Sequence, residues 1–197
     1  MATMRCLLIL FACSLLACSG PEPSETPEPA TEAEPEAATE RAADSPETLP
    51  PPFTGEQIRQ SMTAGSTIRF RIETAGAPSV ISLWEVDANP PEGLSMRSST
   101  LTEDGTVIEG PVSAGPTPWD ELRDHAAFPA ADTTREAATV QTPSGPADGW
   151  RYVRTQEKEG RALVTTYEFA STLPGPPVLM TKQVEGKTVM SMRRIGE

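Results

Sequence analysis

The chain has 197 residues, 28 acidic and 16 basic side chains, a formal charge of -12 and 37% hydrophobic residues. This acidic balance argues against a nucleic-acid-binding protein, which needs a basic surface for the phosphate backbone. All three cysteines lie at or before residue 18, so the rest of the chain can form neither a disulfide nor a zinc site built from cysteines.

The first 17 residues have the composition of an export signal. Arg5 is their only charged side chain, and residues 6–17 form an unbroken run of apolar and small side chains. A helix over this run rises only about 18 Å, whereas the hydrocarbon core of a bilayer is roughly 30 Å thick. We therefore predict a cleaved signal peptide over residues 1–17 rather than a permanent membrane span.

The end of this run, Leu15-Leu16-Ala17-Cys18-Ser19, resembles the lipobox of bacterial lipoproteins. The resemblance implies that diacylglycerol is attached to Cys18 and that cleavage before Cys18 makes it the acylated N-terminus. Ser19 in place of aspartate implies the outer membrane, with the chain facing the periplasm or the cell surface. The alternative is an ordinary secretory signal, which would leave the mature protein without an anchor.

Residues 18–52 are predicted to be the lipidated cysteine and a disordered acidic tether. Nine acids and Arg41 give residues 19–52 a net charge of -8, and Leu49 is their only large apolar side chain. Such a segment cannot build a core. Its prolines and mutually repelling carboxylates favour an extended chain of at most about 105 Å.

Residues 53–197 are predicted to form a single β-rich domain that opens with a helix. Thr54 and Gln57 fit a capping box, and Phe53 and Ile58 fit a hydrophobic staple. The helix is expected over residues 55–64, with Gly65 ending it and one apolar face resting on a sheet.

Beyond this helix the apolar period changes from that of a helix to two, first at Ile68, Phe70 and Ile72. Glycine-containing turns at Asp104-Gly105, Glu159-Gly160, Pro174-Gly175 and Glu185-Gly186 leave no room for helical crossovers, which favours antiparallel neighbours. Further strands are predicted over 80–86, 94–101, 106–109, 134–141, 150–156, 162–170, 178–184 and 188–195.

A second helix is predicted between two of these strands. Thr117 fits an N-cap, Pro118 the first helical position and Asp120 an acid in the first turn, and Pro129 closes the segment. The predicted fold class is therefore α+β and mostly β: a curved antiparallel sheet of seven to nine strands, a short N-terminal helix and one inserted helix.

The chemistry of the domain is defined mainly by exclusion. His125 is the only histidine, and no G-x-S-x-G elbow is present, so neither a serine triad nor a multi-histidine metal site is predicted. His125 is interpreted as part of the helix end, with a ligand or pH-sensing role as the alternative. Asp120 and Asp124 are interpreted as a solvated face rather than an acid/base pair. We predict a non-enzymatic protein without metal or cofactor.

The large apolar side chains support two hypotheses. Core packing is the first. The second is a ligand lining under the curved sheet, because methionine adapts to irregular shapes. The residues that would form this lining are Trp84, Trp119, Trp150, Met96, Met180 and Met190.

Several arginines of the predicted strands have planar guanidinium groups whose paired N–H donors suit carboxylate or phosphate groups. Cross-strand pairing with Glu73, Glu157 or Glu168 is the simpler interpretation. The arginines are Arg69, Arg71, Arg151, Arg154, Arg193 and Arg194.

The order of a short helix, a strand meander and an inserted helix is similar in layout to the half-barrels of periplasmic lipoprotein carriers and related lipid-binding lipoproteins. Together with the lipobox, this predicts a membrane-anchored envelope lipoprotein. We interpret its domain as a non-enzymatic module that binds an envelope protein or polymer, and the alternative is a carrier or sensor for a lipid or other hydrophobic ligand.

Overall fold

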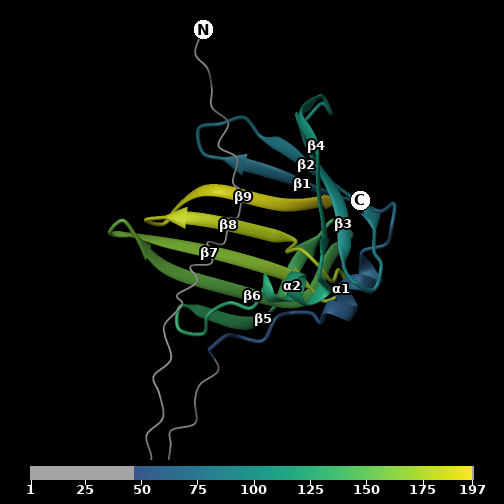
Figure 1. Cartoon of the computed structure of the whole chain (residues 1–197). Helices are drawn as coiled ribbons and strands as arrows, with labels where there is room; N and C mark the ends of the chain where they lie inside the picture. Colours follow the sequence, from purple (N-terminus) through teal and green to yellow (C-terminus); the bar gives the residue numbers. More distant parts are fainter. Residues whose placement is uncertain (1–46, 197) are drawn as a thin grey trace, which may run out of the picture. The chain divides into compact units, whose positions relative to one another are not determined.

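One antiparallel sheet of nine strands organises residues 47–196, which are the residues that the computed structural model describes (Figure 1). Its order is β4-β3-β2-β1-β9-β8-β7-β6-β5. The strands are β1 (Thr67–Thr74), β2 (Val80–Ala88), β3 (Leu94–Leu101), β4 (Val107–Thr117), β5 (Thr133–Thr142), β6 (Gly145–Lys158), β7 (Arg161–Ala170), β8 (Leu179–Val184) and β9 (Lys187–Gly196). The predicted fold class is confirmed.

Two meanders, β1–β4 and β5–β9, meet where β1 pairs with β9. Two-residue hairpins join β6 to β7 and β8 to β9, and both of their loop residues have positive φ: 55° and 72° at Glu159-Gly160, 51° and 76° at Glu185-Gly186. This backbone matches the twist of the flanking strands and needs glycine at the second position. The predicted turns are therefore correct at both sites.

Helix α1 (Gly55–Ser61) begins as the capping box predicts. The amide of Gln57 donates to Thr54 Oγ1 at 3.2 Å, and the amide of Thr54 donates to Gln57 Oε1 at 2.8 Å. The helix ends at Ser61 rather than near Ala64, because Met62 leaves the helical region with ψ 77°. Ile58 and Met62 are both buried.

Replacement of Thr54 by alanine is expected to lower the free energy of unfolding by about 1 kcal/mol, since the first turn of α1 loses its side-chain acceptor. Urea unfolding followed by circular dichroism measures this loss. The matched control is Thr63→Ala, at an exposed threonine just beyond the helix, where a change within about 0.5 kcal/mol is expected. Equal losses for the two variants would contradict the role of the cap.

Helix α2 (Trp119–Asp124) corrects the predicted N-cap. Thr117 is the last residue of β4 and pairs with Leu94, and Pro118 is the N-cap without a side-chain capping bond. The backbone of Thr117 is held by the strand, so its side chain does not cap the helix. Gly93 allows this close approach, because a Cβ there would lie 2.4 Å from the carbonyl oxygen of Thr117.

Strand β4 is also longer than the predicted 106–109. Two Gly-Pro pairs, Gly110-Pro111 and Gly115-Pro116, lie within β4, which continues through them with shifts in its register against β3. Proline lacks an amide donor, which an edge strand tolerates because one of its sides makes no ladder bonds.

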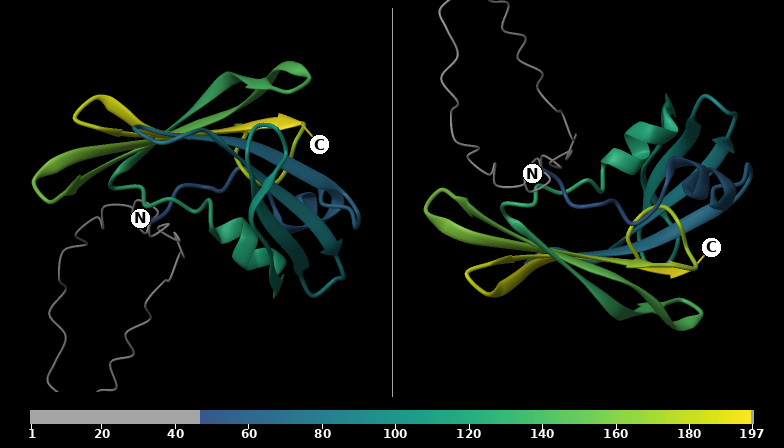
Figure 2. Two further views of the ribbon diagram at one scale, coloured as in Figure 1. Left: turned by 90° about the horizontal axis from the view of Figure 1, so that it is seen from above. Right: turned by 90° about the horizontal axis from the view of Figure 1, so that it is seen from below.

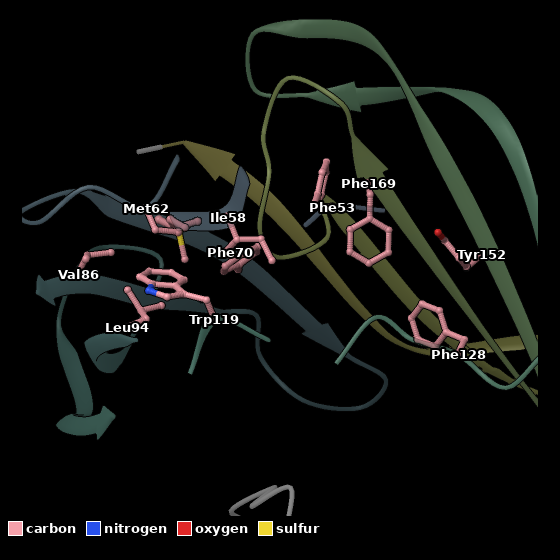
Figure 3. Packing of buried hydrophobic residues seen from close by; sticks show 11 residues of the cluster. Phe53, Ile58, Met62, Phe70, Val86, Leu94, Trp119, Phe128, Tyr152 and Phe169 are labelled. Carbon is pink, nitrogen blue, oxygen red and sulfur yellow. The ribbon is translucent and has the colours of Figure 1, made fainter. Parts of the chain in front are cut away.

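Both helices lie on one face of the sheet, called the inner face here (Figure 2). The core between them and the sheet gathers Trp119, Leu94 and Val86 at one side and Phe128, Tyr152 and Phe169 at the other (Figure 3). The buried members of this core are Phe53, Ile58, Met62, Ile68, Phe70, Val86, Leu94, Trp119, Phe128, Tyr152 and Phe169.

Residues 47–52, which the sequence analysis assigns to the tether, make contacts with the domain. Leu49 packs against the core, its amide donates to the carbonyl of Phe128 at 2.8 Å, and the hydroxyl of Tyr152 donates to the carbonyl of Pro50 at 2.7 Å. The signal peptide, Cys18 and most of the tether lie outside the described residues.

Candidate functional site

Most of the predicted ligand-lining residues are part of a filled core or flank it. Trp119 is buried, and Trp84, Trp150 and Met96 pack against the same cluster. Met180 and Met190 are half-buried on β8 and β9. The structure therefore brings four of the six residues to one cluster.

Aromatic contacts occupy the space in which a ligand would sit. Phe53 reaches in from the segment before α1, with its ring centroid 5.7 Å from that of Trp150 and 6.2 Å from that of Phe169. Phe128, from the connection after α2, stacks on Tyr167 at 4.6 Å. The inner face is filled by these residues from outside the sheet.

The indole N–H groups of two tryptophans also have protein partners. Trp119 Nε1 donates to the carbonyl of Pro90 at 2.9 Å, and Trp84 Nε1 donates to Ser82 Oγ at 3.0 Å. The guanidinium of Arg135 lies over the ring of Trp150, 5.6 Å from its centroid. These contacts are what packing requires of a buried tryptophan, and they favour the core-packing hypothesis.

Both tyrosines of the chain belong to this region, and burial raises the pKa of Tyr152 and of Tyr167 above the usual 10.0. Because the folded-state pKa is raised, the buried neutral hydroxyls contribute their full stabilisation of the folded chain below the unfolded pKa of about 10. This contribution to the free energy of unfolding is lost as the pH rises through the folded-state pKa. We expect the tyrosinate absorbance of the native chain to appear only above pH 10 and together with unfolding. The same chain unfolded in guanidinium is the control, and a native titration that coincides with it would contradict this packing.

A hollow of about 290 Å³ lies beside the end of α1 and has mixed walls in which polar side chains predominate. It contains none of the six predicted lining residues. Its polar side chains are Ser61, Thr63, Ser66, Thr67, Thr172 and Arg194. This is not the continuous apolar cavity that a lipid carrier requires.

The candidate acid/base residues lie on the exposed side of α2. Arg123 pairs with Asp120 at 2.9 Å and with Asp124 at 2.8 Å, which agrees with a solvated face. His125 is exposed at the C-cap of α2. Within residues 47–196 no group of three or more histidine, cysteine, aspartate or glutamate side chains is arranged to hold a metal ion.

The opposite face of the sheet, called the outer face, carries one row of side chains across all nine strands. Direct strand partners connect each member to the next. From β4 to β5 the row reads Val107, Leu101, Ile81, Arg71, Arg193, Leu179, Glu168, Arg151 and Glu136.

The β5 end of this row is electrically paired. Arg151 donates to Glu168 at 2.9 Å and to Glu136 at 2.9 Å. Of the three acids expected as arginine partners, Glu168 is the one that forms an ion pair with an arginine within residues 47–196. Arg71 and Arg154 instead pair with Glu103 and Asp132, each at 2.9 Å. Sequence alternation indicates which face an arginine occupies, but only the strand order determines which acid lies beside it.

The edge strand β4 carries exposed apolar side chains. Val107, Ile108 and Val112 are 60%, 53% and 55% exposed, and Ile195 of β9 is 37% exposed. We call Val107, Ile108 and Val112 the edge patch. Val107 lies opposite Leu101, which pairs with Ile81 on the outer face. Val112 lies opposite Ser98, which pairs with Trp84 on the inner face. The edge patch thus reaches both faces at the free side of β4.

The edge patch is a surface that local sequence patterns do not reveal. Residues 107–109 of the predicted strand 106–109 do belong to β4, but neither the edge position of β4 nor its continuation to Thr117 could be inferred from local spacing. Sheet order is set by the pairing of distant strands, which the chain does not display locally.

Within the described residues no helix combines the length and the hydropathy of a membrane span. No known family model matches the sequence, and no curated protein is detectably related to it. The fold is similar to that of a crystal structure of a candidate lipoprotein from Parabacteroides distasonis ATCC 8503, with a TM-score of 0.45 and 10% identity over 68% of this chain and 95% of that chain.

Proposed function

We propose that this protein is a lipid-anchored, non-enzymatic module of the bacterial cell envelope that docks a partner protein on the edge patch. The observation that carries the proposal is the combination of a filled inner face with exposed valine and isoleucine side chains on one edge strand. Isolated exposed apolar residues are ordinary, but a group of them on one element marks a contact surface.

The mode of docking follows from β4 itself. Pro111 and Pro116 lack amide donors, and the register against β3 shifts near both of them. These features discourage the addition of a further strand along the edge. The partner is therefore expected to pack its apolar side chains on Val107, Ile108 and Val112 rather than extend the sheet by backbone hydrogen bonds.

The anchor rests on the lipobox-like sequence that ends at Cys18. In the proposal, lipid on Cys18 holds the chain at the outer membrane and the acidic segment separates the domain from it. The full-length Cys18→Ala variant is expected to leave the detergent-soluble membrane fraction and to lose metabolic labelling by palmitate. A variant that stays membrane-bound and labelled would contradict anchoring through Cys18.

Docking is tested by placing a photo-crosslinking amino acid at Ile108 of the full-length chain in cells. The matched control is Thr139, an exposed residue of the opposite edge strand β5. We expect a discrete crosslinked species from position 108 that is absent from position 139. Mass spectrometry identifies the partner, which should then bind the purified wild-type chain.

The second half of this test uses Val107→Asp in the same chain. Because Val107 is 60% exposed, its replacement should change the free energy of unfolding by no more than about 0.5 kcal/mol while it removes both the crosslink and the binding of the purified partner. Equal crosslinking from positions 108 and 139, or a crosslink that survives Val107→Asp, would overturn the proposed docking surface.

A further inference from the structure

A second hollow, of about 190 Å³, lies on the outer face beside the edge patch. We call it the outer hollow. The side chains that matter for its chemistry are Arg69, Arg71, Ile81, Leu101, Glu103 and Ile195. It is continuous with the edge patch, because Val107 lies directly opposite Leu101.

The apolar part of the outer hollow is partly covered and partly open. Ile81 and Leu101 face one another across β2 and β3 and are only 7% and 8% exposed. Ile195 falls in the register shift between β1 and β9 and remains 37% exposed. A branched aliphatic side chain that packs here would bury apolar surface of its own and of Ile195, at little cost in removing water from Ile81 and Leu101.

The basic side chains in and beside the outer hollow form an uncommon arrangement. Arg69 and Arg71 line the hollow, and Arg193 lies beside it on β9. Arg71 and Arg193 are direct cross-strand partners, and like charges in this position repel each other. Arg69 lies two residues before Arg71 on the same face of β1. Within residues 47–196, Arg69 and Arg193 form no side-chain ion pair with an acid, and Arg71 forms an ion pair with Glu103.

The carboxylate of Glu103 is already held by three donors. Arg71 donates from Nε at 2.9 Å and from Nη2 at 3.1 Å, and Ser79 donates from its hydroxyl at 2.7 Å. These hydrogen bonds, first that of Ser79 and then those of Arg71, lower the pKa of Glu103. Glu103 therefore stays ionised and fixes Arg71, which leaves the charges of Arg69 and Arg193 for another anion.

The remainder of the same row provides the contrast. Arg151 lies between Glu168 and Glu136, with an ion pair to each, so acids there outnumber arginines. The chain as a whole is acidic, with a charge of -12. An excess of arginine at the outer hollow is thus a local departure from the charge of the rest of the molecule.

We propose that the outer hollow recognises a carboxylate that is covalently attached to a branched aliphatic group, as in a peptide that ends in leucine. The aliphatic group lies on Ile81, Leu101 and Ile195, and the carboxylate accepts hydrogen bonds from Arg69 and Arg193, whose planar forks match its geometry. This inference rests on the proposed docking function and deepens it: the partner that covers the edge patch presents such a terminus to the adjoining hollow.

The test uses the mature chain with Cys18→Ser, which carries no lipid, and N-acetylleucine as the probe. Binding is followed by the backbone amide signals of Arg71, Ile81 and Leu101 in NMR titrations. Saturable shifts are expected with N-acetylleucine. N-acetylleucine amide, which has the same side chain and no charge, should bind about tenfold more weakly, as expected for the loss of charge-assisted hydrogen bonds.

Two charge-neutralising variants locate the site. Arg193→Gln is expected to weaken binding of N-acetylleucine by about tenfold, whereas Arg161→Gln, at an exposed arginine in the β6–β7 hairpin, should leave it unchanged. The proposal is overturned if the acid and the amide bind equally, if Arg193→Gln binds as the wild type does, or if vesicles containing anionic phospholipid compete for these signals while N-acetylleucine does not shift them.

The outcome is separable from that of the docking experiment. A crosslink at Ile108 without binding of N-acetylleucine retains the edge patch and overturns the outer hollow as a carboxylate site. Specific binding of N-acetylleucine without any crosslink supports the carboxylate site as a small-molecule site and overturns protein docking.

Discussion

Replacement of Phe70 by alanine is expected to lower the free energy of unfolding by about 3–5 kcal/mol. Phe70 is 0% exposed, and its ring centroid lies 4.9 Å from that of Trp84. It belongs to β1, which pairs with β2 on one side and with β9 on the other. The lost side chain would leave a cavity between the two meanders and the helices.

Urea denaturation followed by tryptophan fluorescence measures the effect, and Trp84 reports directly on the altered site. Ile108→Ala is the matched control, because it also shortens a large apolar side chain but at a position that is 53% exposed. A change within about 0.5 kcal/mol is expected there. A Phe70→Ala variant as stable as Ile108→Ala would show that the core is not packed as described.

Gly149→Ala is expected to cost about 3 kcal/mol through overpacking. A Cβ at this position of β6 would lie 2.0 Å from the carbonyl oxygen of Phe169 and 3.2 Å from Cα of Ala170. Both contacts are backbone atoms of β7, so no side-chain rotation relieves them. The two strands would have to separate locally, at the end of their ladder where Gly149 pairs with Ala170.

Gly196→Ala provides the control for Gly149→Ala, since it makes the same chemical change in β9 and its added Cβ meets no atom within 4 Å. Its expected effect lies within about 0.5 kcal/mol. Thermal unfolding of the two variants beside the wild type decides the prediction. A wild-type melting temperature for Gly149→Ala would mean that β6 and β7 approach less closely here than the structure shows.

Features set by neighbouring residues could be predicted from the sequence. The capping box of α1 depends on Thr54 and Gln57 alone, and β3 runs over the predicted residues 94–101 because turn-forming residues bound it on both sides. The two-residue hairpins with glycine at their second position are equally local. In each case the deciding contacts lie within a few residues of one another.

Features set by distant residues could not be predicted. The predicted helix after Thr54 was too long because Met62 turns into the core, and Thr117 was assigned to the N-cap of α2 although it lies opposite Leu94 in the sheet.

 The site follows the same division: aromatic and methionine content suggested a lining under the sheet, but composition does not show that Phe53 and Phe128 enter that space from outside the strands. The edge patch and the outer hollow depend on the order of β4, β3, β2, β1 and β9, which only the folded chain provides.

The junction of the two meanders has a consequence for how the chain reaches its native state. Arg71 in β1 and Arg193 in β9 are paired, although almost the whole domain separates them in sequence. During synthesis one edge of β1 has no partner until β9 has left the ribosome, and contacts of such long sequence separation slow folding. Removal of β9, residues 187–196, would therefore divide the sheet at its middle rather than shorten its margin.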